Sequence, residues 1–114
     1  MKIEIWHNSR CSKSRNALSY LQDKNIELEI KEYLKTPLSV AELKDVLSKL
    51  NMKPSELVRN KEDIYKELNL KDVSEEELLE AMVKNPKLIE RPIIINNDKA
   101  VVARPLENIE KVLG

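Results

Sequence analysis

Glycine is almost absent from this sequence of 114 residues, because Gly114 is the only one. A glycine-rich loop for a phosphate group or a dinucleotide is therefore excluded, and any anion site must rest on a helix N-terminus and on side chains. Cysteine and histidine also occur only once each. A single cysteine excludes an internal disulfide and a secreted disulfide framework, and one cysteine with one histidine excludes a structural zinc site, which takes about four ligands.

An excess of charge of one sign is also lacking, since 20 lysines and arginines balance 20 aspartates and glutamates. This balance gives no reason to expect a nucleic-acid or membrane partner. No apolar stretch approaches the about 18 residues of a membrane span, and the N-terminus does not have the pattern of a signal peptide. We therefore expect a cytoplasmic protein with one domain over residues 1–114. A monomer is expected too, because no apolar face is left over.

The first third of the chain has the pattern of two strands joined by a helix. Ile3 and Ile5 alternate with charged residues ahead of Trp6, and residues 26–30 repeat the alternation, so both stretches are predicted strands. Between them, apolar residues at helical spacing predict a helix over residues 12–24 that starts at Cys11.

A helical insertion over about residues 38–86 follows. The boxes Ser39-x-x-Glu42 and Ser74-x-x-Glu77 each predict a helix start. After the insertion, three isoleucines at 93–95 predict a buried strand, and residues 96–98 predict a turn to a hairpin partner at 100–103. A last helix is predicted to begin with Pro105 at its first position.

The element order β-α-β, then helices, then β-β-α, with a thiol where the first helix begins, resembles the thioredoxin-like fold. It implies an α/β protein with a four-stranded mixed sheet, whose first two strands are parallel through a right-handed crossover. Pro92 falls where such folds place a cis-proline. The cis form occurs at only about 5–6% of such bonds, so only the fold, and not the sequence, makes it expected.

Cys11 is the predicted nucleophile or redox thiol. Its neighbours are polar, whereas an unreactive buried cysteine is expected among apolar residues. A helix N-terminus and nearby cations, including Arg10 and Arg15, favour a thiolate. Ser14 makes the motif Cys-x-x-Ser, so the hydroxyl can bond the thiolate but the resolving thiol must be external. Ala17 stands where a phosphatase-type Cys-x5-Arg loop needs arginine, which excludes that loop.

His7 and Asn8 precede the thiol in the same loop. His7 is either a general base, given its near-neutral pKa, or a residue that bonds the loop backbone, and the second is the commoner case. Asn8 is expected to close the turn and also to reach the thiolate.

Arginine is used sparingly, at five positions against fifteen lysines. Arg91 and Arg104 each precede a proline and flank the predicted hairpin, so we expect both to point to one end of the sheet. Each alone could be an ordinary surface cation. A planar guanidinium suits a tetrahedral oxyanion better than lysine does, so together with Cys11 they predict a thiolate that attacks an oxyanion.

Four segments carry a family resemblance: IWHNSRCSKSRN at 5–16, LVRN at 57–60, LIERPIII at 88–95 and ARPLE at 103–107. They are similar to the glutaredoxin-coupled arsenate reductases, the ArsC-like branch of the thioredoxin superfamily. The resemblance implies that Cys11 is the nucleophile and that Arg59, Arg91 and Arg104 bind arsenate and arsenite. It also implies that His7, Asn8 and Ser14 lower the pKa of the thiol.

The reaction that the resemblance implies needs no metal and no bound organic cofactor. Cys11 forms an adduct with arsenate, glutathione or an equivalent thiol attacks it, and glutaredoxin completes the reduction. Two alternatives stay open at this point. One is a glutathione-dependent thiol reductase without an arsenate role, for which loss of the three arginines would be expected. The other is an Spx-like redox regulator that binds RNA polymerase, against which Ser14 and Arg104-Pro105 argue.

Overall fold

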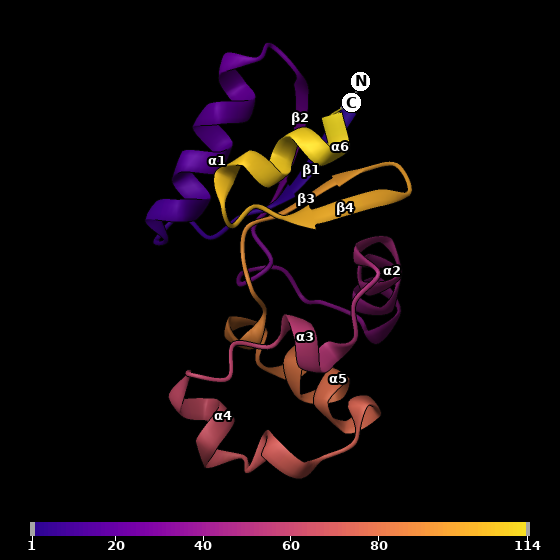
Figure 1. The fold of residues 1–114 in the computed structure, drawn as a ribbon. Coiled ribbons are helices and arrows are strands. Elements are labelled where there is room, and N and C mark those ends of the chain that lie inside the picture. The colour runs from indigo at the N-terminus through magenta and orange to yellow at the C-terminus, as the bar shows by residue number, and fades with distance from the viewer. Residues whose placement is uncertain (1, 114) are drawn as a thin grey trace. The chain divides into compact units, whose positions relative to one another are not determined.

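The computed structural model describes residues 2–113, and contacts within the chain divide it into two compact units (Figure 1). The first unit comprises the stretch up to Thr36 and the stretch from Arg91 onward, and the second comprises Pro37–Glu90. The predicted helical insertion at about 38–86 falls within the second unit. A single domain over residues 1–114 stays a prediction.

Four strands of the first unit form one sheet in the order β2-β1-β3-β4. Their bounds are Lys2–Trp6 for β1, Glu27–Lys31 for β2, Ile93–Asn96 for β3 and Lys99–Val102 for β4. β1 and β2 are parallel, and β3 is antiparallel to both β1 and β4. The helix α1 (Ser12–Asp23) joins β1 to β2, as a parallel pair requires. The predicted four-stranded mixed sheet is confirmed.

One face of this sheet is covered by α1 and by the C-terminal helices η3 (Leu106–Ile109) and α6 (Glu110–Leu113) (Figure 1). Alternation along β1 points Ile3 and Ile5 to that face. The buried cluster there consists of Ile3, Ile5, Ala17, Leu21, Ile94, Ala103, Ile109 and Val112. Full burial of a large aliphatic side chain contributes about 1.5–3 kcal/mol to stability. This cluster therefore stabilises the packing of β1 against α1.

The other side of β1 carries Trp6, which stacks on Tyr33 with ring centroids 6.0 Å apart and an interplanar angle of 24°. The Trp6 indole N–H donates to Glu4 Oε2 at 3.0 Å. Both rings are almost fully buried. The stack ties the chain after β2 to the last residue of β1, immediately before the loop that contains Cys11.

The second unit is helical. Its elements are α2 (Val40–Leu50), α3 (Pro54–Leu57), α4 (Asp63–Glu67), η1 (Leu70–Asp72), α5 (Glu75–Lys84) and η2 (Pro86–Leu88). The predicted capping box at Ser39 is complete, since Ser39 Oγ accepts from the backbone N–H of Glu42 and the Glu42 carboxylate accepts from the Ser39 N–H. At Ser74 only the first of these two bonds forms as predicted: its hydroxyl accepts from the Glu77 N–H at 3.2 Å.

Within the second unit, the chain after α3 pairs with the C-terminal end of the unit. Val58 and Ile89 form an antiparallel bridge, flanked by the bonds Arg59 N–H to Leu88 O at 2.7 Å and Glu90 N–H to Leu57 O at 3.1 Å. This short pairing brings the segment around Arg59 beside Glu90.

Two X-Pro bonds of the first unit are cis, Arg91-Pro92 and Arg104-Pro105. The prediction that Pro105 is the first helical residue is wrong. Pro105 precedes η3 and has extended backbone, with ψ of 169°. Its carbonyl accepts from Asn108 N–H at 3.0 Å, so the helix opens as a 3₁₀ turn one residue later.

Among residues 2–113, no helix has the length and apolar character that crossing a membrane requires.

Candidate active site

The loop between β1 and α1 is shaped by Asn8. The backbone carbonyl of Asn8 accepts from the Cys11 N–H, and its side-chain Oδ1 accepts from the Arg10 N–H, both at 3.0 Å. These bonds form the turn that the sequence predicts for asparagine. The loop delivers Cys11 to the N-cap position of α1, with extended φ and ψ of −101° and 123°.

Ser14 holds this loop together from inside the first turn of α1. Its side chain is fully buried, its Oγ accepts from the Asn8 N–H at 3.0 Å, and it lies 2.7 Å from His7 Nδ1. Burial lowers the pKa of His7, while Glu32 raises it by a smaller amount. His7 is therefore neutral near pH 7. The hydroxyl of Ser14 is thus engaged with His7 and Asn8. That the side chains of these three residues lower the pKa of the thiol stays a prediction.

The environment of Cys11 favours the thiolate. Burial alone raises the pKa of the thiol, but the backbone N–H groups of Ser14 and Lys13 lower it, and so does the guanidinium of Arg91. The net pKa is below the ordinary value. The sequence predicted this direction from the helix N-terminus and from cations of the loop, whereas the cation that lowers the pKa comes from the other end of the chain.

Arg104 contacts the thiol directly. Its Nη2 lies 3.6 Å from Cys11 Sγ, and its Nε donates to the Arg91 carbonyl at 2.7 Å. The carbonyl of Pro92 accepts from the Ala103 N–H at 3.0 Å. These bonds join the two ends of the β3–β4 hairpin, so Arg91 and Arg104 come to the same end of the sheet, as predicted.

Two hydrogen-bond donors of the Arg91 side chain are buried. Its Nε and Nη1 are buried and have no hydrogen-bond partner among residues 2–113. An unsatisfied buried donor costs about 1–3 kcal/mol, more when it is charged, and native proteins rarely leave one unexplained. Unpartnered guanidinium N–H groups beside a thiol of lowered pKa are donors that an oxyanion can accept from.

The comparison with known families agrees with this geometry. A family model described as the ArsC family matches residues 6–112. The chain belongs to the ArsC family. The resemblance to the ArsC family is confirmed.

Relatives in this family match along nearly the whole chain. YfgD of Escherichia coli K12, an uncharacterized protein, is 50% identical over 116 residues, which cover 99% of this chain and 98% of YfgD. A protein of Neisseria meningitidis serogroup A named arsenate reductase is 49% identical, with 98% of both chains covered. The solved structure titled arsenate reductase from Vibrio cholerae superposes with a TM-score of 0.94 at 41% identity, with 98% of both chains covered. The predicted thioredoxin-like fold of the ArsC type is confirmed.

Arg59, the third arginine that the resemblance selects, lies in the second unit of this ArsC chain. Its Nη1 is 3.1 Å from Glu62 Oε1 and its Nε is 3.5 Å from Glu90 Oε1. The bridge between Val58 and Ile89 explains its place beside Glu90. The two carboxylates are not predicted from the sequence, although Glu62 at i+3 is a visible signal.

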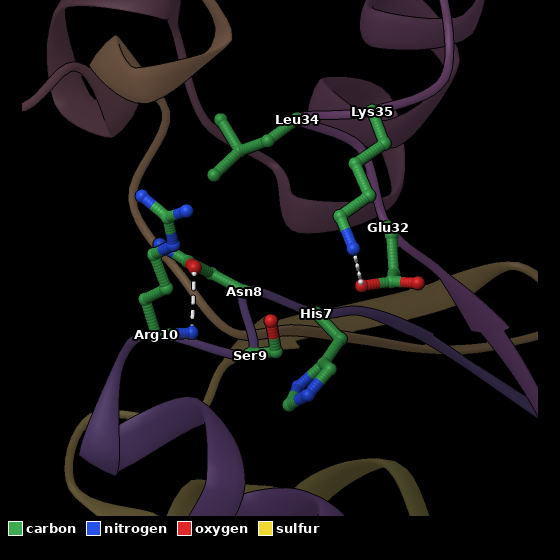
Figure 2. A pocket seen from close by; sticks show the side chains of 7 residues that line it. All are labelled: His7, Asn8, Ser9, Arg10, Glu32, Leu34 and Lys35. Atoms are coloured by element: carbon green, nitrogen blue, oxygen red, sulfur yellow. Dashed lines mark hydrogen bonds and ion pairs between the residues drawn. The ribbon is translucent and has the colours of Figure 1, made fainter.

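A pocket beside the loop was also missed from the sequence. It has a volume of about 210 Å³ and is lined by His7, Asn8, Ser9, Arg10, Glu32, Leu34 and Lys35; we call it the loop pocket (Figure 2). Because β1 and β2 are parallel, their carboxyl ends share one edge of the sheet, and the His7 N–H donates to the Lys31 carbonyl at 2.8 Å. The predicted parallel pairing of these two strands was the signal for this pocket that the sequence offered.

Among residues 2–113, no group of three or more His, Cys, Asp or Glu side chains has an arrangement that could hold a metal ion.

The lowered pKa of Cys11 leads to a direct prediction. We expect iodoacetamide to alkylate the thiol with a pH midpoint below that of free cysteine, because the N–H groups of Ser14 and Lys13 and the charge of Arg91 outweigh burial. The rate should therefore reach its plateau at lower pH than that of free cysteine measured in parallel. A midpoint at or above that of free cysteine would contradict the assignment of Cys11 as a nucleophile.

Proposed function

We propose that this chain is a thiol-dependent oxidoreductase that reduces arsenate to arsenite. The observation that carries the proposal is the buried, unpartnered Nε and Nη1 of Arg91 beside a low-pKa Cys11 that Arg104 contacts at 3.6 Å. A nucleophile and oxyanion donors on rigid elements are what such a reaction needs. Relatives named arsenate reductase in Neisseria meningitidis and Haemophilus influenzae support the choice of substrate.

The first half of the reaction joins Cys11 to arsenic. The Cys11 sulfur forms a bond to As(V), and one arsenate oxygen leaves as water. The guanidinium groups of Arg91 and Arg104 stabilise the negative charge on the remaining arsenate oxygens. Arsenic is not reduced in this step. The assignment of Arg59 to the same oxyanion stays a prediction.

The second half consumes two external thiols, because Ser14 cannot resolve a disulfide with Cys11. A small thiol, for which we propose glutathione, replaces a second arsenic oxygen, and that oxygen leaves as water. A further thiol, for which we propose glutaredoxin, attacks the sulfur of the small thiol. The electron pair of the broken S–As bond stays on arsenic, which becomes As(III), and a disulfide leaves. Water then releases arsenite and restores the Cys11 thiol. Overall, one arsenate and two thiols give arsenite, one disulfide and one water.

No metal and no bound organic cofactor takes part in these steps. Arsenic itself accepts the electrons, the thiols supply them, and the protein contributes a nucleophile, a shaped loop and positive charge.

The test is a coupled assay. With glutathione, glutaredoxin, glutathione reductase and NADPH, we expect arsenate to cause NADPH oxidation that depends on the concentration of this protein. Phosphate, a tetrahedral anion that thiols do not reduce, should cause none. If alkylation shows a reactive thiol but arsenate causes no turnover, the arsenate proposal fails. Reduction of a small disulfide by glutathione in that case would favour the thiol-reductase alternative.

A further inference from the structure

The loop pocket has an uneven set of charges. Arg10 and Lys35 are exposed cations, Glu32 is the one carboxylate of the lining, and His7 is held neutral near pH 7 because burial lowers its pKa. The guanidinium of Arg10 forms no ion pair with a residue of the part of the chain that the structure describes. A ligand that matches this lining carries two negative groups and one positive group.

The two cations of the loop pocket, Arg10 and Lys35, lie apart from each other. Two anionic groups of one ligand can therefore bind at separate positions. Figure 2 shows Arg10 on one side of the loop pocket and the Glu32–Lys35 pair on the other, with Asn8 and Leu34 between them. Lys35 Nζ lies 3.3 Å from Glu32 Oε1, and the two side chains are 72% and 42% exposed. An exposed ion pair of this kind contributes only about 0–1 kcal/mol, so a zwitterionic ligand can exchange with it at small cost.

We propose that the loop pocket binds the small reducing thiol of the reaction, a peptide thiol with two carboxylates and one ammonium group, the chemical class that includes glutathione. Arg10 and Lys35 each receive a carboxylate, and Glu32 receives the ammonium group. The inference rests on the proposed function, because it assigns a place on this chain to the co-substrate of that reaction.

The size and position of the loop pocket suit this role. At about 210 Å³ it is smaller than the about 300–1,000 Å³ that enclose a drug-sized ligand, so it holds the charged groups and leaves the thiol outside. Residues 7–10 form one wall, and Cys11 is the next residue of the same turn. An extended tripeptide spans roughly 10 Å, which lets a thiol reach the arsenic on Cys11 while the carboxylates stay bound. There the thiol gives its proton to the departing oxygen and forms the S–As bond.

The direct test measures binding without chemistry. S-methylglutathione, which has the same charges but no free thiol, is titrated by calorimetry into the reduced wild-type chain. The same titration is made with the double variant Arg10→Gln/Lys35→Gln and with Lys99→Gln, an exposed lysine of β4 outside the loop pocket. We expect at least tenfold weaker binding in the double variant and wild-type binding in Lys99→Gln. Circular dichroism checks that each variant is folded.

A kinetic arm uses arsenate turnover with glutaredoxin present. The double variant should raise the KM for glutathione about tenfold with little change in kcat, since Arg10 and Lys35 bind the thiol and do not touch arsenic. Glutathione whose two carboxylates are esterified should bind wild-type protein about tenfold less tightly than free glutathione does.

The outcomes separate the two proposals. If wild-type protein does not bind S-methylglutathione at millimolar concentration, or if the double variant binds it equally well, the loop pocket is not the thiol site. Turnover with glutaredoxin that needs no small thiol would also overturn the inference, because the reductant would then be a protein. If binding depends on Arg10 and Lys35 but arsenate is not reduced, the inference stands and the proposed substrate is wrong.

Discussion

Replacement of Cys11 by serine is expected to reduce arsenate turnover to the background of the coupled assay. The substitution keeps the size of the side chain, but a serine hydroxyl is far less acidic than a thiol whose pKa is lowered by the first turn of α1 and by Arg91. Without an ionised nucleophile the S–As bond does not form. The expected loss is the largest of any single substitution, since every later step requires that bond.

The matched control for Cys11→Ser is Ser12→Ala, which changes an exposed residue at the start of α1 next to the thiol. This variant should keep turnover within about twofold of wild type, because surface substitutions of this kind usually change little. Trp6 lies at the end of β1 before the loop, so its fluorescence reports whether both variants are folded. Turnover of Cys11→Ser above one tenth of wild type would show that Cys11 is not the nucleophile.

Replacement of Arg91 by alanine is expected to reduce kcat/KM for arsenate by about 10²–10³, the range for removal of one donor from an oxyanion site. Two effects act in the same direction. The buried Nε and Nη1, which have no partner among the described residues, are lost to the oxyanion, and the Cys11 thiol loses a cation that lowers its pKa. The alkylation midpoint should therefore move to higher pH in the same variant.

Arg91→Lys separates these two effects. Lysine keeps the positive charge but lacks the planar fork of donors, so the alkylation midpoint should rise less than in Arg91→Ala while arsenate turnover falls. Lys87→Ala, which removes an exposed cation four residues away in η2, is the control and should change neither quantity. Equal losses in Arg91→Ala and Lys87→Ala would contradict an oxyanion site at Arg91.

Much of the scaffold could be predicted from the sequence, because it depends on residues close together in the chain. The alternation of Ile3 and Ile5, the three isoleucines of β3 and the capping box at Ser39 each encode an element through contacts over one to four positions. The same holds for Cys11 at the start of α1, which follows from where the apolar helical pattern begins.

Predictions from local sequence patterns were less reliable where one pattern is compatible with two arrangements of the chain. Pro105 fits the first position of a helix by composition, yet its extended backbone places it one residue before η3. The Cys-x-x-Ser motif predicts that the Ser14 hydroxyl can bond the thiolate, and the structure has this hydroxyl engaged with His7 and Asn8. The choice in each case depends on neighbours that the local sequence does not specify.

What the sequence determined by itself is therefore a thiol at a helix N-terminus in a β-α-β and β-β-α framework, with arginines that precede prolines. Only the tertiary structure decided how these parts act on one another. It sets Arg104, 93 positions from Cys11, at 3.6 Å from the thiol, leaves two donors of Arg91 buried without a partner among residues 2–113, and gives Arg59 two carboxylates. The physical reason is that backbone conformation follows from near neighbours, whereas the burial and pairing of a charge depend on which distant segments pack against it.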